Sequence, residues 1–381
     1  MNSDSTANVQ EPAEKAPLRV LHFVTGGFSG GATQVAIALV NAAQASSTMT
    51  PLLALRRKSH SPKERIAQLQ RDGVPLVLVA GWSHIATIWH LARVCRQFRP
   101  DILVAHGFSE HLWGRYAGLL AKVPYLVQVE HNTRERYTRW RLMQSRWLAK
   151  HTVRIVGCSE GVEQALLAQG LPAARILAIL NGIALAPFAG ASAVDFSSRE
   201  PALVMVARLS KQKDHATLIH ALALLRARGL TPVLHLAGGG KSAHRKPLEQ
   251  LVNALGLQDQ VRFLGVIRNV PALLMQSQIA VLSTHYEGMP LALIEGMAAG
   301  CAVVASHVPG VREIIREGID GILVAPKDPA ALADALEALL KNPEHAAKLA
   351  CAARDRALSE FSVERMHQGY ERLFLDIAGR S

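Results

Sequence analysis

Two carboxylates in the second half of the chain have a spacing that suits binding to a polyhydroxylated ligand. Glu287 and Glu295 are eight residues apart in the segment STHYEGMPLALIEGMAAGCAVVAS, residues 283–306. An ionised carboxylate can accept hydrogen bonds from vicinal hydroxyls such as those of a ribose or another sugar. Glu295 lies in an apolar helical stretch, where an unpaired charge is costly. The pair is therefore predicted to bind a ligand rather than to be solvated.

Two cations follow another apolar run, residues 202–206, five positions apart. Arg208 and Lys213 could clamp a diphosphate, the guanidinium as a planar fork and the ammonium as a point charge. Cations at the protein surface are commonly only solvated, so this pair by itself leaves both interpretations open.

A glycine cluster, GGFSGG at residues 26–31, stands between a β-type apolar run and a helical one. Glycines let backbone N–H groups approach an anion, and the following helix start adds partial positive charge. The cluster lacks the GxGxxG spacing and the lysine of a Walker motif. A plain tight turn is thus an equal alternative.

The elements that must position these residues alternate between strands and helices along the chain. Strands are expected at residues 18–25, 51–55, 76–79, 101–105, 125–129 and 154–158, and again at 202–206, 233–237, 261–264, 279–282, 302–305 and 322–324. Helices are expected between them and at residues 329–341, 343–353 and 363–377. Such alternation predicts an α/β fold with parallel, doubly wound sheets.

A chain of 381 residues is too long for one ordinary core and suits two Rossmann-like domains facing a central cleft. The expected divisions are a disordered tail at 1–16, a first domain at 17–188, a linker at 189–200 and a second domain at 201–360. Residues 361–381 are expected to form a helix that crosses back to the first domain.

Four stretches together resemble one enzyme family. EGMPLALIEGMAAG, ARLSKQK, GGFSGGATQ and VPGVREII look like the motifs of the retaining glycosyltransferase family 4, which has the GT-B fold. The resemblance spans residues 18 to about 374. It implies transfer of a hexosyl group from a nucleotide diphosphate sugar whose nucleotide is UDP or GDP. Glycan or lipid-linked acceptors in cell-surface polysaccharide, lipopolysaccharide or glycolipid synthesis are implied, at a cytoplasmic site that includes the cytoplasmic face of the inner membrane.

The resemblance also implies how the diphosphate is held. Arg208 and Lys213 would bind it and stabilise its leaving charge, while Gly30 and Gly31 approach it from the first domain. Retention would come from attack on the face that the phosphate leaves. No DxD-like motif occupies a plausible loop, so the reaction is expected to need no metal and no cofactor.

Other matched positions take up the rest of the donor. Glu295 would hold the ribose hydroxyls and Glu287 the transferred sugar, with a covalent nucleophile as a minor alternative for Glu287. The turn whose amides meet the phosphate and sugar is formed by Met289, Pro290 and Leu291.

Three further positions complete the implied site, two in the first domain and one in the second. His131 resembles the family's histidine near the donor sugar and the acceptor. His106 is a less secure acceptor-side neighbour, for which a structural role is an equal alternative. Val266 belongs to the backbone that meets the base. The sequence departs from the family pattern at Ala207, where many relatives have glycine, and at Gln34 and Val35, where acidic or basic residues often follow the glycine loop. These departures bear on the sugar contacts.

The cysteines give no sign of a metal or disulfide framework. They are far apart, lack CxxC or Cys/His spacing and sit in apolar surroundings, which predicts buried free thiols; they are Cys95, Cys158, Cys301 and Cys351.

Charge is concentrated in the first half, where residues 1–190 carry roughly +10 of the net +12. The segment Arg134 to Arg154 contains seven cations and one acid. As a helix it would align Trp140, Met143 and Trp147 on one stripe. It could lie on an anionic membrane, or it could dock on the sheet through its tryptophans with its arginines solvated. No recognised nucleic-acid-binding module is present.

Two other functions stay open for this pattern of residues. A nucleotide-sugar epimerase of the same fold would bind the donor and transfer nothing. A non-catalytic nucleotide-sugar-binding protein would keep the diphosphate clamp without a reaction.

Overall fold

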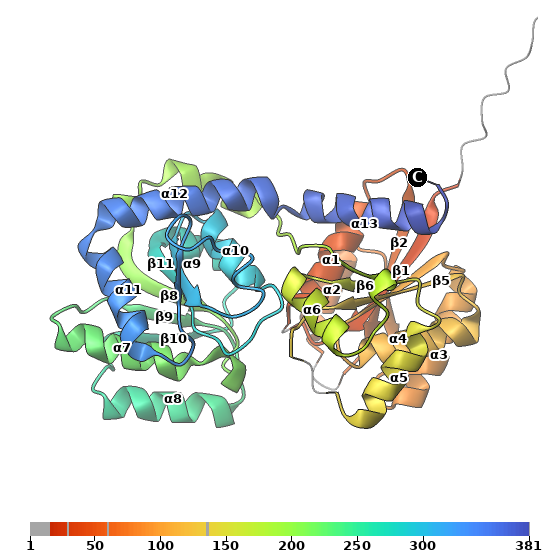
Figure 1. Ribbon diagram of the computed structural model, residues 1–381, viewed down its shortest axis with the longest axis horizontal. Coiled ribbons are helices and arrows are strands. Elements are labelled where there is room, and N and C mark those ends of the chain that lie inside the picture. Colours follow the sequence, from red (N-terminus) through yellow and green to blue (C-terminus); the bar gives the residue numbers. More distant parts are fainter. Residues whose placement is uncertain (1–15, 29, 59–60, 135–136, 381) are drawn as a thin grey trace, which may run out of the picture.

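The computed structural model describes residues 16–28, 30–58, 61–134 and 137–380, and shows two domains that each contain one parallel sheet (Figure 1). The predicted tail at 1–16 therefore lies outside the described residues except for Ala16. Every strand pair in both sheets is parallel, and the order reverses beside the first strand of each sheet, so the expected doubly wound α/β fold is confirmed.

The N-terminal sheet has the order β3-β2-β1-β4-β5-β6-β7. Its strands coincide with apolar runs, which are buried along the central strands and partly buried in the edge strands β3 and β7. They are β1 Leu18–Thr25, β2 Met49–Arg56, β3 Leu76–Val79, β4 Ile102–His106, β5 Tyr125–Glu130, β6 Arg154–Gly157 and β7 Ile176–Ala178.

Helices cover both faces of this sheet. α1 (Gly31–Ala43) and α2 (Lys63–Arg71) pack on one face, where Val40 and Leu69 belong to one apolar cluster. α3 (His84–Phe98), α4 (Glu110–Ala121) and α5 (Arg139–Ala149) pack side by side on the other. α6 (Glu160–Ala168) joins β6 to β7.

The C-terminal sheet has the order β10-β9-β8-β11-β12-β13. Its strands are β8 Glu200–Val206, β9 Leu234–Ala237, β10 Val261–Gly265, β11 Ser277–Leu282, β12 Ala302–Ser306 and β13 Ile322–Val324. Its helices are α7 His215–Ala227, α8 Ser242–Ala254, α9 Val270–Gln276, α10 Leu291–Ala298, α11 Pro329–Lys341 and α12 Pro343–Glu360.

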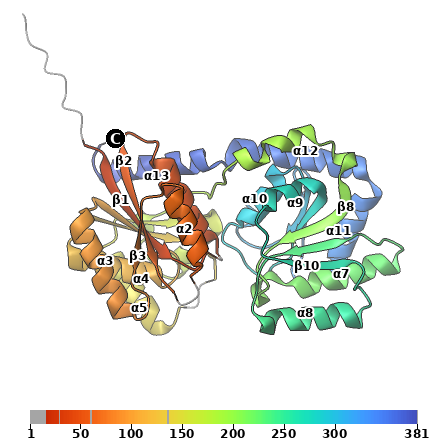
Figure 2. The same ribbon diagram turned by 180° about the vertical axis from the view of Figure 1, so that it is seen from behind.

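Two stretches connect the domains. Residues 179–199 hold the short 3-10 helices Ala186–Ala193 and Phe196–Ser198 where a linker was predicted. The second stretch runs from α12 into α13 (Val363–Ile377), which lies along the N-terminal domain in both views (Figures 1 and 2). There Ser46 Oγ donates a 2.8 Å hydrogen bond to Glu371, and Thr48 bonds to the same carboxylate.

The basic segment corrects one expectation. Its helix spans only Arg139–Ala149, because the hydroxyl of Thr138 accepts a hydrogen bond from the Arg141 amide and caps the start. Trp140 and Trp147 are 64% and 48% exposed, while Leu148 and Ala149 are buried. Docking of this helix through its tryptophans was therefore a wrong interpretation.

The thiols correct another expectation. Cys95, Cys158 and Cys301 are buried, but Cys351 is exposed on α12. Within the described ranges, no helix is long and apolar enough to cross a membrane.

Candidate functional site

The carboxyl ends of the two sheets face each other between the domains, and an ion pair of the C-terminal domain lies at this edge. Lys213, at the end of a short 3-10 turn after β8, donates to Glu287 with an Nζ to Oε1 distance of 2.5 Å. Both side chains are largely buried, with 14% and 8% exposed. Open α/β sheets bind ligands at this edge, so the pair lies where the motif spacing predicted chemistry.

Backbone contacts hold the loops that carry this pair against each other. The Thr284 hydroxyl lies 2.8 Å from Glu287 Oε1 and 3.1 Å from the Gln212 carbonyl. The amide of His285 donates to the same carbonyl over 2.9 Å, and the Gln212 side chain donates to the Tyr286 carbonyl over 2.8 Å. The ammonium and the carboxylate are therefore fixed before any ligand binds.

The N-terminal domain contacts the same loop directly. The Thr133 hydroxyl, after β5, donates to the Glu287 carbonyl over 2.8 Å. The Ser159 hydroxyl, after β6, donates to the Gly288 carbonyl over 2.8 Å. A Cβ at Gly288 would lie 2.1 Å from the His131 carbonyl oxygen, so only glycine allows this approach.

Gly288→Ala is expected to lower kcat/KM about 10-fold to 30-fold, because the added methyl group pushes the two halves of the site apart and small misplacements are costly. Steady-state kinetics checks this. Gly190→Ala is the matched control, since a Cβ there meets nothing within 4 Å. Equal activity of the two variants would contradict the close approach.

The side-chain carboxyl of Glu295, on α10, has no hydrogen-bond partner among the described residues, and the residue is partly buried. Burial raises the pKa of its carboxyl to about 7. A carboxyl with this environment is poised to gain a hydrogen-bonding ligand, which favours its charged form.

Arg208 is exposed at the end of β8 and makes no hydrogen bond or ion pair with the part of the chain that the structure describes. Beside it runs the glycine triplet 238–240, after β9. A Cβ at Gly238 would lie 2.0 Å from the Ala207 carbonyl oxygen, and the Leu209 amide donates to the Gly239 carbonyl over 2.9 Å. The structure thus brings Lys213 and Glu287 together, and leaves the Arg208 guanidinium and the Glu295 carboxyl without a partner among the described residues.

The remaining predicted donor positions surround these charges. Gly31, the first residue of α1, faces Leu291 across the domain boundary, with 3.9 Å from a Cβ position to Leu291 Cδ1. Gly30 precedes α1, and no side chain caps the amides of the helix start. Val266, 84% exposed, lies against Gly239 at the other side of the edge.

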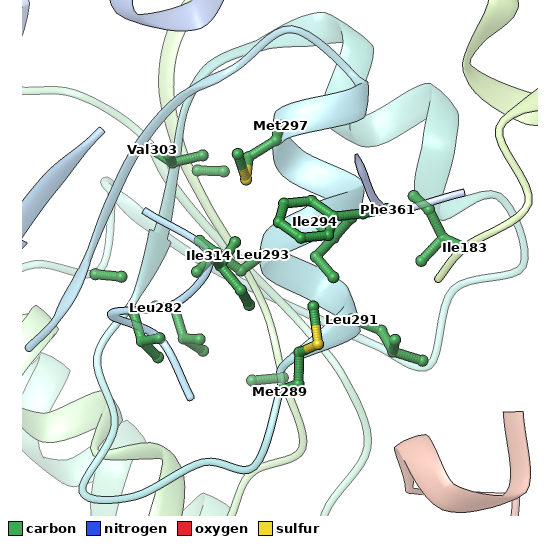
Figure 3. Packing of buried hydrophobic residues seen from close by; sticks show 14 of the residues in the cluster. Ile183, Leu282, Met289, Leu291, Leu293, Ile294, Met297, Val303, Ile314 and Phe361 are labelled. Atoms are coloured by element: carbon green, nitrogen blue, oxygen red, sulfur yellow. The ribbon is translucent and has the colours of Figure 1, made fainter. Parts of the chain in front are cut away.

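The turn before α10 is anchored in the apolar core. Met289 and Leu291 are buried with Pro290 between them, and Figure 3 shows them beside Ile294 and the other core residues of α10. The Asn181 side-chain amide donates to the Met289 carbonyl over 3.3 Å, which ties the turn to the segment between the domains. This packing fixes the start of α10 near Gly31.

Three histidines form a chain near the carboxyl edge of the N-terminal sheet. His22 Nδ1 lies 3.0 Å from His106 Nε2, and His106 Nδ1 lies 3.2 Å from His131 Nε2. Burial lowers the pKa of His131 to about 4 and that of His22 to about 3, so the chain is uncharged near neutral pH. His131 Nδ1 is buried and has no hydrogen-bond partner in the described residues.

Several of these groups were not predicted. They are His22, Thr133, Ser159, Gln212, Thr284 and the glycines 238–240. Only the glycine triplet had a usable signal, because it follows a strand directly. Within the described ranges, no group of three or more His, Cys, Asp or Glu side chains could hold a metal ion.

Models of two protein families match the two domains. The family described as Glycosyltransferase Family 4 matches residues 29–186, and the family described as Glycosyl transferases group 1 matches residues 192–356. Together they cover most of the chain.

Two curated relatives match over similar lengths. The glycogen synthase of Mycobacterium tuberculosis is 29% identical over 302 residues, 74% of this chain and 70% of the relative. The putative glycosyltransferase EpsD of Bacillus subtilis is 28% identical over 310 residues, 74% of this chain and 78% of the relative.

Solved structures share the fold across nearly the whole chain. Anabaena HepE, in a complex with UDP-glucose, superposes with a TM-score of 0.82 at 20% identity, over 94% of this chain and all of HepE. The sucrose-phosphate synthase of Thermosynechococcus elongatus superposes with a TM-score of 0.77 at 20% identity, over 96% of this chain and all of that one.

Proposed function

Since the chain belongs to glycosyltransferase family 4, with the GT-B fold and a nucleotide-sugar donor, we propose that it transfers a hexosyl group from a UDP-sugar. The acceptor is a hydroxyl of a glycan or of a lipid-linked molecule. The transfer retains the configuration at the sugar and needs no metal. The observation that carries this proposal is the Lys213–Glu287 pair, held at the domain boundary by Thr133 and Ser159. UDP is chosen over GDP because the similar HepE structure holds UDP-glucose.

The diphosphate is the group that leaves, and charge must be neutralised as it departs. Lys213 is already fixed at the edge, and Arg208 is an unpaired guanidinium on the same loop. Two such cations stabilise a developing oxyanion electrostatically. The free amides at Gly30 and Gly31 add partial positive charge from the opposite domain.

Glu287 is better suited to orient the transferred sugar than to attack it. Its Oε1 accepts from both the Lys213 ammonium and the Thr284 hydroxyl, which stabilise the charge and lower nucleophilicity. His131 Nδ1 would bond a hydroxyl of the sugar or the acceptor, and His106 and His22 would hold its ring in place. These two histidines are positioning residues, so the uncertain role of His106 becomes structural support.

The proposed acceptor and location follow from the distribution of positive charge in the chain. The N-terminal half carries most of the positive charge, which suits a phosphorylated or lipid-linked acceptor at the cytoplasmic face of a membrane, reached through the segment Arg134 to Arg154. Transfer to cell-surface polysaccharide or glycolipid precursors fits such an acceptor.

Thermal-shift measurements test the donor and the absence of a metal. UDP is expected to raise the melting temperature more than GDP or ADP, because the nucleotide with the lowest Kd stabilises the folded protein most. A ligand present at about 100 times its Kd adds about 2.7 kcal/mol of stability. EDTA is expected to leave the shift unchanged, since Lys213 and Arg208 supply the positive charge. Loss of the shift on EDTA treatment would overturn the metal-free mechanism, and a larger shift with GDP would change the base.

Donor affinity is expected to depend on pH through Glu295. Its pKa of about 7 lies above the ordinary value of 4.5, so ionisation costs stability as pH rises between these values. Hydrogen bonding by ribose hydroxyls to the ionised form reverses this preference. The Kd for UDP-glucose, whose esterified diphosphate does not titrate near neutrality, should therefore rise about 5-fold to 10-fold from about pH 8 to about pH 6.

Isothermal titration calorimetry of wild type and Glu295→Gln measures this effect. The variant should bind UDP-glucose more weakly at the higher pH and show a flat pH profile. A pH profile of the variant that parallels the wild type would assign the dependence to another group.

Product analysis separates the two rival functions. An epimerase would convert the UDP-sugar without releasing UDP, whereas transfer releases UDP in proportion to the acceptor. A non-catalytic binding protein would show the thermal shift and neither product.

A further inference from the structure

Two helices of the N-terminal domain expose an unusual number of large apolar side chains. Four of the five tryptophans are exposed here: Trp82 by 83% and Trp89 by 59% at α3, Trp140 by 64% and Trp147 by 48% on α5. Ile85 and Met143 add 70% and 52% exposure. We call these six residues the aromatic face. Tryptophan is seldom left in water without a partner, and clusters of this kind mark interaction sites.

Stacked rings make this one surface rather than two. His84, at the start of α3, stacks on Trp113 of α4 with 4.2 Å between ring centroids. Trp113 stacks on Tyr116 at 6.5 Å, and Tyr116 stacks on Trp147 of α5 at 6.1 Å. The three helices lie side by side in both views (Figures 1 and 2). The exposed groups of α3 and α5 are therefore joined across α4.

The charge of this surface is of one sign. Neither α3 nor α5 contains an acidic residue. Their arginines are exposed or partly exposed and form no ion pair with the residues that the structure describes; they are Arg93, Arg96, Arg139, Arg141 and Arg146. Exposed tryptophans flanked by arginines that have no acidic partner match the interfacial region of a bilayer, where rings enter the headgroup layer and cations meet anionic lipids.

The α5 end of the aromatic face lies toward the site. Helices in parallel α/β domains start at the carboxyl edge of the sheet, so Trp82 and Trp140 lie at the end of the surface nearest that edge. The Arg141 guanidinium lies 5.2 Å from the ring centroid of Phe108, which follows β4. Phe108 in turn packs against Tyr137 with 5.0 Å between centroids. The surface and the acceptor side of the cleft are thus continuous.

We propose that the aromatic face docks the protein on an anionic bilayer, with α3 and α5 in the headgroup layer and the cleft at the membrane surface. A second copy of this chain is a poor occupant, because a two-fold contact would place the arginines of both copies together with no acid between them. The proposal rests on the proposed function only for the identity of a lipid-linked acceptor. Docking itself is measured without transfer.

Co-sedimentation of the full-length protein with vesicles tests this. Binding is expected to phosphatidylcholine vesicles that contain phosphatidylglycerol, to be about 10-fold weaker with phosphatidylcholine alone, and to weaken as salt is raised. The double variants Trp82→Ser/Trp89→Ser and Trp140→Ser/Trp147→Ser should each lose about 10-fold in partitioning. Tryptophan fluorescence should shift to the blue on binding.

Matched controls come from the other domain. Ile319→Ser removes an exposed apolar side chain of similar exposure, and Arg245→Glu reverses an exposed arginine on α8; both should bind vesicles like wild type. The tryptophan variants should keep the UDP thermal shift, which separates failure of docking from failure of the proposed function.

Three outcomes would overturn docking. The first is equal binding to neutral and anionic vesicles, and the second is unchanged binding by both double variants. The third is concentration-dependent self-association that the tryptophan variants abolish, in the absence of vesicle binding.

Discussion

Lys213→Ala is expected to lower kcat by about 10³-fold, which corresponds to about 4 kcal/mol of lost transition-state stabilisation. The ammonium is held 2.5 Å from Glu287 in a largely buried position, so no other cation can take its place without rearrangement. Its charge is needed most as the diphosphate departs, and kcat should therefore change more than KM. Transfer or donor hydrolysis under saturating UDP-sugar measures this.

The loss of a buried partner must be separated from the loss of catalysis. Lys213→Ala leaves the Glu287 carboxylate unpaired, which should cost about 3 kcal/mol of stability. The double variant Lys213→Ala/Glu287→Gln removes that penalty and should regain stability but not activity. Lys211→Ala, an exposed cation two residues away, should behave as wild type. A tenfold or smaller effect of Lys213→Ala would assign the neutralising role elsewhere.

Arg208→Ala is expected to lower kcat/KM by about 10²-fold to 10³-fold and to abolish the thermal shift with UDP. The guanidinium is exposed and forms no hydrogen bond or ion pair with the described part of the chain, so its removal should leave stability within about 0.5 kcal/mol of wild type. Loss of UDP binding with unchanged stability would show that the side chain contributes to ligand binding and not to folding.

Arg208→Lys should recover only part of the loss, because a point charge cannot form the two parallel hydrogen bonds of the guanidinium fork. Arg245→Ala, on α8 of the same domain, is the control. If Arg208→Ala bound UDP like wild type, the diphosphate would have to be held by other groups.

Much of this architecture was predictable because the strands of parallel sheets appear in the sequence as short, uninterrupted apolar runs. β1, β3 and β13 begin and end where the runs do, and α11 and α13 begin after caps that the sequence displays. β8 and β11 each start two residues earlier than expected, since pairing extends a strand beyond its most apolar residues.

The site was predictable in its charges but not in its supports. Lys213 and Glu287 are 74 positions apart and could be paired only through a family pattern. The link from His22 to His131 joins β1, β4 and the residue after β5, and no local spacing in the sequence indicates it. Contacts such as Ser159 to Gly288 depend on how two domains meet, which hydrophobic periodicity does not specify.

The exposed tryptophans show a further limit. A helical stripe of Trp140, Met143 and Trp147 indicates an apolar side, but the stripe alone does not reveal whether a sheet or solvent lies against it. The small residues Ser145 and Ala149 and the single Leu148 provide the docking side instead.

The two chain crossings between the domains are fastened to each other. Ile183 donates its amide to the Phe361 carbonyl and accepts from the Val363 amide, both over 2.9 Å, and a Cβ at Gly182 would lie 2.1 Å from the Ser362 carbonyl oxygen. These contacts tie the two connecting stretches to each other at one position. We therefore expect opening between the domains to be a rotation centred near Ile183 and Ser362.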